Sequence, residues 1–204
     1  MTDNSLLAVH AWPAAQQAAV ASLKEQGLAV ISVSSGVFEA RDIARQKIRQ
    51  AVTEMLALAY ACPPGLPQLH SAPGQPLRVD IPGYYIGLSL SHEPGLSLAA
   101  VRDGGTVGVD LMRIDAALDW APVAQLYLGA ETCTEIGRQP LGQQAGHFAQ
   151  AWTALEARLK CRGASITEWS LELEHLLAKA PLKRLGVPPG FAGSVALGPS
   201  SAMK

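Results

Sequence analysis

Three short apolar segments that follow one another closely in the middle of the chain constrain the fold most. They cover residues 85–91, 96–102 and 106–111. Their length and their content of aliphatic and β-branched residues predict three consecutive strands. The turn between the last two reads Asp103-Gly104-Gly105, which is typical of a tight β-hairpin.

Two long helical patterns flank these strands. From residue 39 to about 60, apolar residues recur every three or four positions, which leaves Arg41, Arg45 and Arg49 near the opposite edge of the helix. A second long helix is expected from about residue 143 to 162, with Gly163 as its C-cap. The shorter predicted elements are a strand at 5–12, a helix from Pro13 to about Gly27, a strand at 28–33, a helix at 120–128 and a strand at 191–197.

A long loop is expected between the first long helix and the strands. Residues 62–83 contain six prolines and three glycines, and loops of that length often carry function. Helix and strand patterns occur both in the first ~110 residues and in the remainder, which is consistent with two halves packed together.

Composition excludes several classes of protein. Of the 204 residues 49% are hydrophobic, so the chain is not intrinsically disordered. The net charge of −1 provides no global positive field for nucleic acid. An anionic ligand would therefore need a local pocket of cations.

Targeting and cysteine patterns favour a reduced, cytoplasmic protein. The first residues lack a basic region, and no apolar run approaches 18 residues, so we expect neither a signal peptide nor a membrane span. The three cysteines form no Cys-x-x-Cys pair, so neither a disulfide framework nor a structural zinc site is expected.

Three positions are candidates for chemistry, and each has an ordinary structural explanation. Asp110 ends an apolar strand, where a carboxylate can bind a hard cation or simply form a turn. Glu156 and Lys160 lie four residues apart at the border of a stripe predicted to be buried, and most such pairs are solvated ion pairs. His92 follows an alternating strand, where it could donate to a phosphate or be structural. The predicted stripe comprises Phe148, Ala151, Trp152, Leu155 and Leu159.

Together these positions resemble the motifs of the 4′-phosphopantetheinyl transferase superfamily. The order is Ser-Leu-Ser-His ending at His92, then Val-Gly-Val-Asp ending at Asp110, then Trp-Thr-x-x-Glu-Ala-x-x-Lys from Trp152 to Lys160. The last motif is the most specific of the three. Weaker matches are Gly74-Gln75-Pro76, Tyr127-Leu-Gly-Ala-Glu131 and the closing segment 190–196. The match spans about residues 40–198, and the chain length resembles that of the two-lobed, monomeric class.

The resemblance implies an α+β fold of two pseudo-twofold lobes, 1–105 and 106–204, with coenzyme A in the cleft between them. The implied reaction is Mg²⁺-assisted transfer of phosphopantetheine to a serine of an apo acyl or peptidyl carrier protein, which releases 3′,5′-ADP. Asp110 and Glu156 match the metal-binding carboxylates, and Lys160 matches the lysine near the diphosphate. Coenzyme A would also contact His92, Arg45 or Arg41, Gln75 and Ser91, with His92 and the arginine at its 3′-phosphate. Neither nucleic acid nor membrane is an expected partner.

Three residues depart from the family pattern. Met112 stands where many members carry a second acid, and a thioether is a poor ligand for Mg²⁺. Leu155 and Gln75 each replace a basic residue, which should weaken binding of an anion. These departures leave an alternative open: a catalytically impaired module that binds coenzyme A or a carrier protein.

Overall fold

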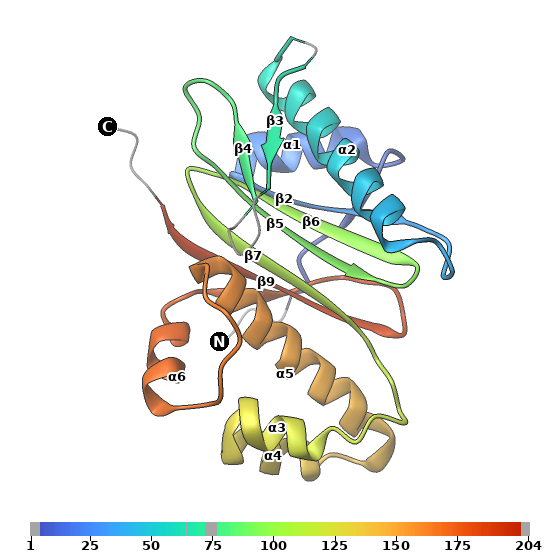
Figure 1. Ribbon diagram of the computed structural model, residues 1–204, viewed down its shortest axis with the longest axis vertical. Coiled ribbons are helices and arrows are strands. Elements are labelled where there is room, and N and C mark those ends of the chain that lie inside the picture. Colours follow the sequence, from blue (N-terminus) through green and yellow to red (C-terminus); the bar gives the residue numbers. More distant parts are fainter. Residues whose placement is uncertain (1–4, 64, 72–76, 201–204) are drawn as a thin grey trace.

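The computed structural model describes residues 5–63, 65–71 and 77–200, which form an α+β fold (Figure 1). Two sheets pack face to face, and helices cover the outer face of each. The α+β class predicted from the sequence is confirmed. Within the described part of the chain, none of the helices combines the length and the apolar character that crossing a bilayer requires.

The first sheet has the strand order β1-β2-β6-β5. β1 (His10–Ala11) runs parallel to β2 (Leu28–Ser34), whereas β6 (Leu96–Asp103) is antiparallel to both β2 and β5 (Ile86–Glu93). Side chains alternate across it: Ala29 and Ile31 face α1 (Gln16–Gln26) and α2 (Arg41–Tyr60), while Leu28 and Val30 face the other sheet. Because both faces of the first half of β2 are buried, its first four residues, Leu28 to Ile31, are all apolar.

The second sheet has the order β7-β9-β8, and all its neighbours are antiparallel. It consists of β7 (Gly105–Arg113), β9 (Phe191–Ser200) and β8 (Leu182–Arg184). Val107, Val109 and Leu111 of β7 pack against Leu98 and Val30 of the first sheet and bury the core between the two sheets. The long helix α5 (Leu141–Arg162) covers the opposite face of β7 and β9.

Several short elements were not anticipated. The predicted loop at 62–83 contains the small antiparallel pair β3 (Gln68–His70) and β4 (Arg78–Asp80). Helix α3 (Ala121–Tyr127) lies where a helix was predicted, but α4 (Gly129–Gly137), α6 (Leu171–Ala178) and β8 were missed. The N-terminal strand predicted at 5–12 is much shorter: only His10 and Ala11 lie in β1, and Leu7 makes an isolated bridge to Leu185.

The hairpin predicted between the last two central strands is wrong. The turn at Gly104 exists, but β6 pairs with β2 and β5, whereas β7 pairs with β9 in the other sheet. The guanidinium of Arg102 donates to the carbonyl oxygens of Thr106 and Gly198, at 3.1 and 2.6 Å, and ties the two sheets together where the chain crosses. The hairpin connects β5 to β6 instead, through a turn at Gly95, where φ is +92°.

The buried stripe predicted for α5 is also partly wrong. Phe148 and Leu159 are buried as expected, but Ala151, Trp152 and Leu155 are only partly buried. The remaining buried positions of α5 are mostly small: Ala149, Thr153, Ala157 and Cys161. Small side chains prevail because α5 packs directly against the backbone of β7.

Candidate functional site

A cavity of about 930 Å³ lies where α2, β5, β7 and α5 converge. It receives side chains from both sheets and from the two longest helices, which lie far apart in the sequence. Its lining includes Arg41, Arg45, Arg49, Ser89, Ser91, His92, Glu93, Asp110, Met112, Trp152, Glu156 and Lys160. Of the site residues predicted from the sequence, only Gln75 is missing from this lining, because it lies outside the described residues.

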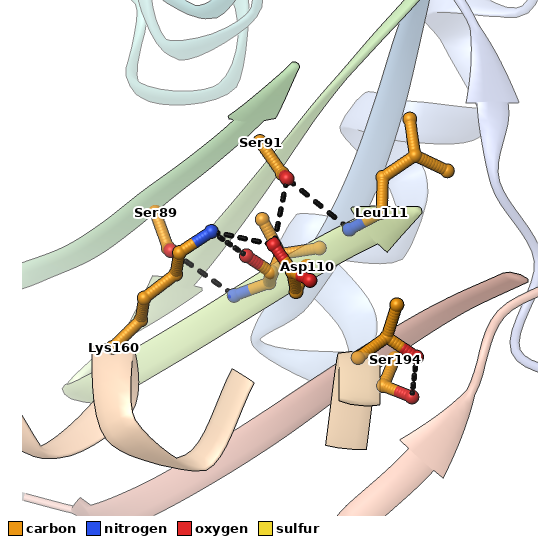
Figure 2. Close-up of polar contacts among 8 residues, drawn as sticks. Ser89, Ser91, Asp110, Leu111, Lys160 and Ser194 are labelled. Carbon is orange, nitrogen blue, oxygen red and sulfur yellow. Dashed lines mark hydrogen bonds and ion pairs between the residues drawn. The ribbon is translucent and has the colours of Figure 1, made fainter. Parts of the chain in front are cut away.

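Small residues on one face of β5 bring it close to β7. Gly87, Ser89 and Ser91 alternate along the strand, so they share a face. A Cβ added at Gly87 would lie 2.0 Å from the carbonyl oxygen of Gly105, so only glycine allows this approach. Between β5 and β7, the hydroxyls of the two serines take the place of backbone carbonyls as hydrogen-bond acceptors. The hydroxyl of Ser89 accepts from the Val109 N–H at 3.0 Å (Figure 2).

Asp110 is the buried acid of the cavity. Its Oδ1 accepts a hydrogen bond from the Ser91 hydroxyl at 2.9 Å, and that hydroxyl in turn accepts from the Leu111 N–H at 3.1 Å. The same Oδ1 lies 2.7 Å from Lys160 Nζ, which also donates to the Val109 carbonyl at 3.2 Å (Figure 2). The Asp110 side chain is 9% exposed and that of Lys160 33% exposed. Ser91 therefore positions the acid.

A glycine on β7 allows the close packing of α5, which carries Glu156 and Lys160. A Cβ at Gly108 would lie 2.0 Å from the Ala157 carbonyl oxygen, so the helix backbone lies directly on the strand. Because Gly108 and Asp110 are two residues apart, the same face of β7 meets Lys160. Nearer the start of α5, the hydroxyl of Thr153 forms a hydrogen bond of 3.0 Å with the hydroxyl of the fully buried Ser194 of β9. The Glu/Lys pair is thus directed at a buried acid.

Glu156 and Asp110 form an acidic pair suited to a cation. Burial raises the pKa of Glu156, the negative charge of Asp110 raises it further, and Lys160 opposes the shift. Carboxylate oxygens are the protein ligands that Mg²⁺ prefers, and octahedral Mg²⁺ commonly retains several waters. Among the described residues no group of three or more histidine, cysteine or acidic side chains could hold a metal. The donor set therefore fits a partly hydrated Mg²⁺ held by two carboxylates.

The opposite wall of the cavity is basic. Arg41, Arg45 and Arg49 follow one another at intervals of four residues along α2. Burial, followed by the positive charges of Arg45 and Arg41, lowers the pKa of His92 from its usual 6.5 to about 4. His92 is therefore neutral at pH 7, with its Nδ1 2.9 Å from the Ser97 hydroxyl. Cations this dense are suited to a polyanionic ligand.

Two lining residues were not anticipated as functional. Ser89 lies in the Ser-Leu-Ser-His motif, and its period-two relation to Ser91 was the available signal. Arg49 was visible as the third arginine on its helix edge, but nothing in the sequence distinguished it from a solvated cation. Met112 lines the cavity beside Asp110 and also packs against a cluster formed by Ala124, Ile136 and Phe148.

Comparison with known proteins identifies one relevant relative. No protein-family profile matches the chain. The chain is 31% identical over 179 residues to the L-aminoadipate-semialdehyde dehydrogenase-phosphopantetheinyl transferase of Eremothecium gossypii. The alignment covers 84% of this chain but 58% of the relative, so the chain spans less than two thirds of that protein's length.

Proposed function

The chain is a distant homologue of a phosphopantetheinyl transferase, as its motifs predicted, and from that relationship we propose that it is itself such an enzyme. It transfers 4′-phosphopantetheine from coenzyme A to a serine of an apo acyl or peptidyl carrier protein and releases 3′,5′-ADP. The observation that carries the proposal is the meeting of Asp110, Glu156 and Lys160 on one cavity, opposite a row of arginines.

The basic wall binds the anionic end of the substrate. Coenzyme A carries a 3′-phosphate and a diphosphate, and both need cations when they leave water. We assign the 3′-phosphate to His92 and Arg45, with Arg41 beside them, and the diphosphate to Lys160. Ser91 holds Asp110 in place through a hydrogen bond and lines the same cavity. Gln75 stays an expected contact.

The acidic side of the cavity would hold Mg²⁺ through Asp110 and Glu156. When bound there, the ion would neutralise charge on the diphosphate during transfer. Lys160 lies at hydrogen-bond distance from Asp110, so its ammonium group can move between the acid and an incoming phosphate oxygen. Met112, which lines the same cavity, is a poor ligand for Mg²⁺, so water would take the place of a second acid there.

The reaction is a phosphoryl transfer that depends on positioning. The carrier serine Oγ attacks the β-phosphorus of coenzyme A, a new P–O bond forms, and the P–O bond to 3′,5′-ADP breaks. Glu156 accepts the serine proton, and the leaving phosphate carries the electron pair of the broken bond. Lys160 and the arginines stabilise charge that develops on phosphate oxygens.

We also propose that residues 1–105 and 106–204 are two pseudo-twofold lobes of a monomer. The proposal is supported by the presence of a sheet covered by a long helix in each part, α2 in the first and α5 in the second. The cavity receives residues from both parts, so one chain supplies the whole cleft.

The test is a mass measurement on a carrier protein. The protein is incubated with an apo carrier, coenzyme A and Mg²⁺, and the carrier is then weighed by mass spectrometry. Wild type should add phosphopantetheine, Glu156→Gln should add none, and Glu172→Gln, which removes an exposed acid of α6, should behave as wild type.

The same experiment distinguishes an active transferase from the alternative, a catalytically impaired binding module. The departures from the family pattern at Met112, Leu155 and Gln75 are the reason for considering that alternative. That protein would bind coenzyme A without modifying any carrier. Equal transfer by wild type and Glu156→Gln would show that the Glu156 carboxylate is needed neither as a metal ligand nor as the base.

A further inference from the structure

Arg49 is a basic residue of the cavity that carries a buried donor without an acceptor among the residues that the structure describes. Its side chain lines the cavity from α2, yet its Nε is buried and forms no hydrogen bond. Across the described residues, no ion pair involves its guanidinium group either. By contrast, Lys160 pairs with Asp110, and Arg45 lies 3.5 Å from the carboxylate of Asp42.

A buried donor without an acceptor is unusual, because burial removes its hydrogen bonds to water without replacing them. A guanidinium in a cavity beside other cations is also repelled by them unless an anion is present. Both costs disappear when a phosphate enters the cavity and accepts from the guanidinium. The unpaired state of Arg49 therefore indicates a residue arranged for a ligand.

The position of Arg49 along α2, compared with positions along β5, identifies which phosphate it can reach. Residues of the two elements that lie side by side are said to be at the same level. α2 begins near the end of β5, because Ser34, shortly before α2, pairs with Leu96, which pairs with Glu93. α2 ends near the start of β5, where the ring of Tyr60 packs on that of Tyr84. Arg49 lies two turns farther along α2, about 12 Å at 1.5 Å per residue. Ser89 lies four residues before Glu93, about 13 Å back along β5. Arg49 and Ser89 are thus at the same level.

Lys160 occupies that level too. It donates to the carbonyl of Val109, whose N–H is bonded to the Ser89 hydroxyl. Arg49 on α2 and Lys160 on α5 therefore line the same stretch of the cavity, while Arg41, at the start of α2, lies toward the Glu93 end.

We propose that Arg49 binds the diphosphate of coenzyme A from the α2 side, opposite Lys160. The inference rests on the proposed function, because it assumes that coenzyme A occupies the cavity. It adds a second cation to the diphosphate, whose P–O–P linkage is cleaved when 3′,5′-ADP leaves, and it separates Arg49 from the residues assigned to the 3′-phosphate.

The test compares two ligands without carrier protein, so that binding is measured in the absence of turnover. Calorimetry gives the affinities of wild type, Arg49→Gln and Arg162→Gln for coenzyme A and for 3′-dephospho-coenzyme A. Arg162 is exposed at the end of α5 and outside the cavity, and it is the charge-matched control. Arg49→Gln should lower the affinity for each ligand about tenfold, because both ligands contain the diphosphate. Arg162→Gln should keep both affinities within about twofold of the wild-type values.

Melting temperatures of the ligand-free proteins distinguish a binding role from a structural one. Because the described part of the chain gives the Arg49 guanidinium no ion pair to lose, Arg49→Gln should melt no lower than wild type. If it does melt lower, Arg49→Lys, which keeps the charge, should recover most of the affinity for both ligands.

Three outcomes would overturn one or both proposals. An unchanged affinity of Arg49→Gln overturns the role of Arg49, and so does a loss confined to coenzyme A, which would assign Arg49 to the 3′-phosphate. If wild type binds neither ligand, the proposed function itself fails, and the assignment of Arg49 fails with it.

Discussion

Lys160 Nζ and Asp110 Oδ1 lie 2.7 Å apart, and this ion pair joins the last turn of α5 to the middle of β7. The acid is nearly buried, with 9% of its side chain exposed, so it depends on Lys160 and on the Ser91 hydroxyl for compensation. The pair thereby fixes the position of α5 on the sheet as well as the charge of the cavity.

A double-mutant cycle should measure that dependence. We expect Lys160→Met to lower the free energy of unfolding by about 1–3 kcal/mol, because it leaves a nearly buried carboxylate with only neutral donors. In the Lys160→Met background, Asp110→Asn should cost much less than it costs in wild type. Urea unfolding of the four proteins gives the coupling free energy. Additive effects would contradict the expectation and show that solvent already compensates the acid.

The approach of α5 to β7 can be tested at Gly108. A Cβ there would lie 2.0 Å from the Ala157 carbonyl oxygen and 2.4 Å from the Cys161 nitrogen, both of them backbone atoms. Gly108→Ala should therefore lower the free energy of unfolding by about 1–3 kcal/mol. It should also reduce transfer activity, because Glu156 and Lys160 move away with the helix.

The matched control is Gly142→Ala, at the start of α5, where a Cβ would meet nothing within 4 Å. Alanine is the better helix former, so this variant should gain up to about 1 kcal/mol in unfolding free energy and keep its activity. Equal stabilities of the two variants in urea would show that β7 and α5 can separate without cost.

The long elements could be predicted because their signals are local. α2 and α5 lie within two residues of their predicted bounds, and Gly163 caps α5 with φ at +64°. The central strands were also predictable, because each is an apolar run that is bounded by turn residues. How those strands pair could not be predicted, because β6 and β7 look like a hairpin locally, whereas their partners β2 and β9 lie far away in the sequence.

The site was predictable where residue type and order were distinctive. His92, Asp110, Glu156 and Lys160 do meet on one cavity, although their chemical roles stay predictions. α4 was missed because it follows α3 almost directly. The break occurs at Gly129, whose φ is +85° and against which the side chain of Trp169 packs. That contact depends on the tertiary fold and has no local signature.

The lowered pKa of His92 predicts how stability changes with pH. His92 titrates at about 4 in the folded protein and near 6.5 when unfolded, so between these values the unfolded state binds more protons. The contribution of the neutral imidazole is complete above about pH 6.5 and is lost as the pH falls toward 4. Relative to His92→Gln, wild type should therefore become less stable over that interval in urea unfolding measured at several pH values.

Nuclear magnetic resonance can observe the same group directly. The resonance absent from His92→Gln should titrate with a midpoint near 4 in the ligand-free protein, because burial and then the positive charges of Arg45 and Arg41 lower the pKa of the ring. Adding coenzyme A should raise that midpoint, since a phosphate favours the charged imidazolium. A ligand-free midpoint near 6.5 would contradict both the burial and the cationic surroundings of the ring.

Met112 offers a test of the metal site, because it lies two residues after Asp110 on β7 and lines the same cavity. Residues two apart on a strand share a face, so a carboxylate at position 112 would be directed at the proposed Mg²⁺. Met112→Glu should therefore lower the Mg²⁺ concentration needed for half-maximal transfer to a carrier protein. The measurement is a Mg²⁺ titration of the initial rate.

Met112→Gln is the control, because it has nearly the same size as the glutamate variant and carries no charge. Both variants lose part of the contact of Met112 with the cluster of Ala124, Ile136 and Phe148, so both should melt somewhat lower than wild type. Only the glutamate variant adds a preferred ligand for Mg²⁺, so only its Mg²⁺ requirement should fall. An unchanged requirement in Met112→Glu, or full activity in Asp110→Ala, would place the metal away from β7.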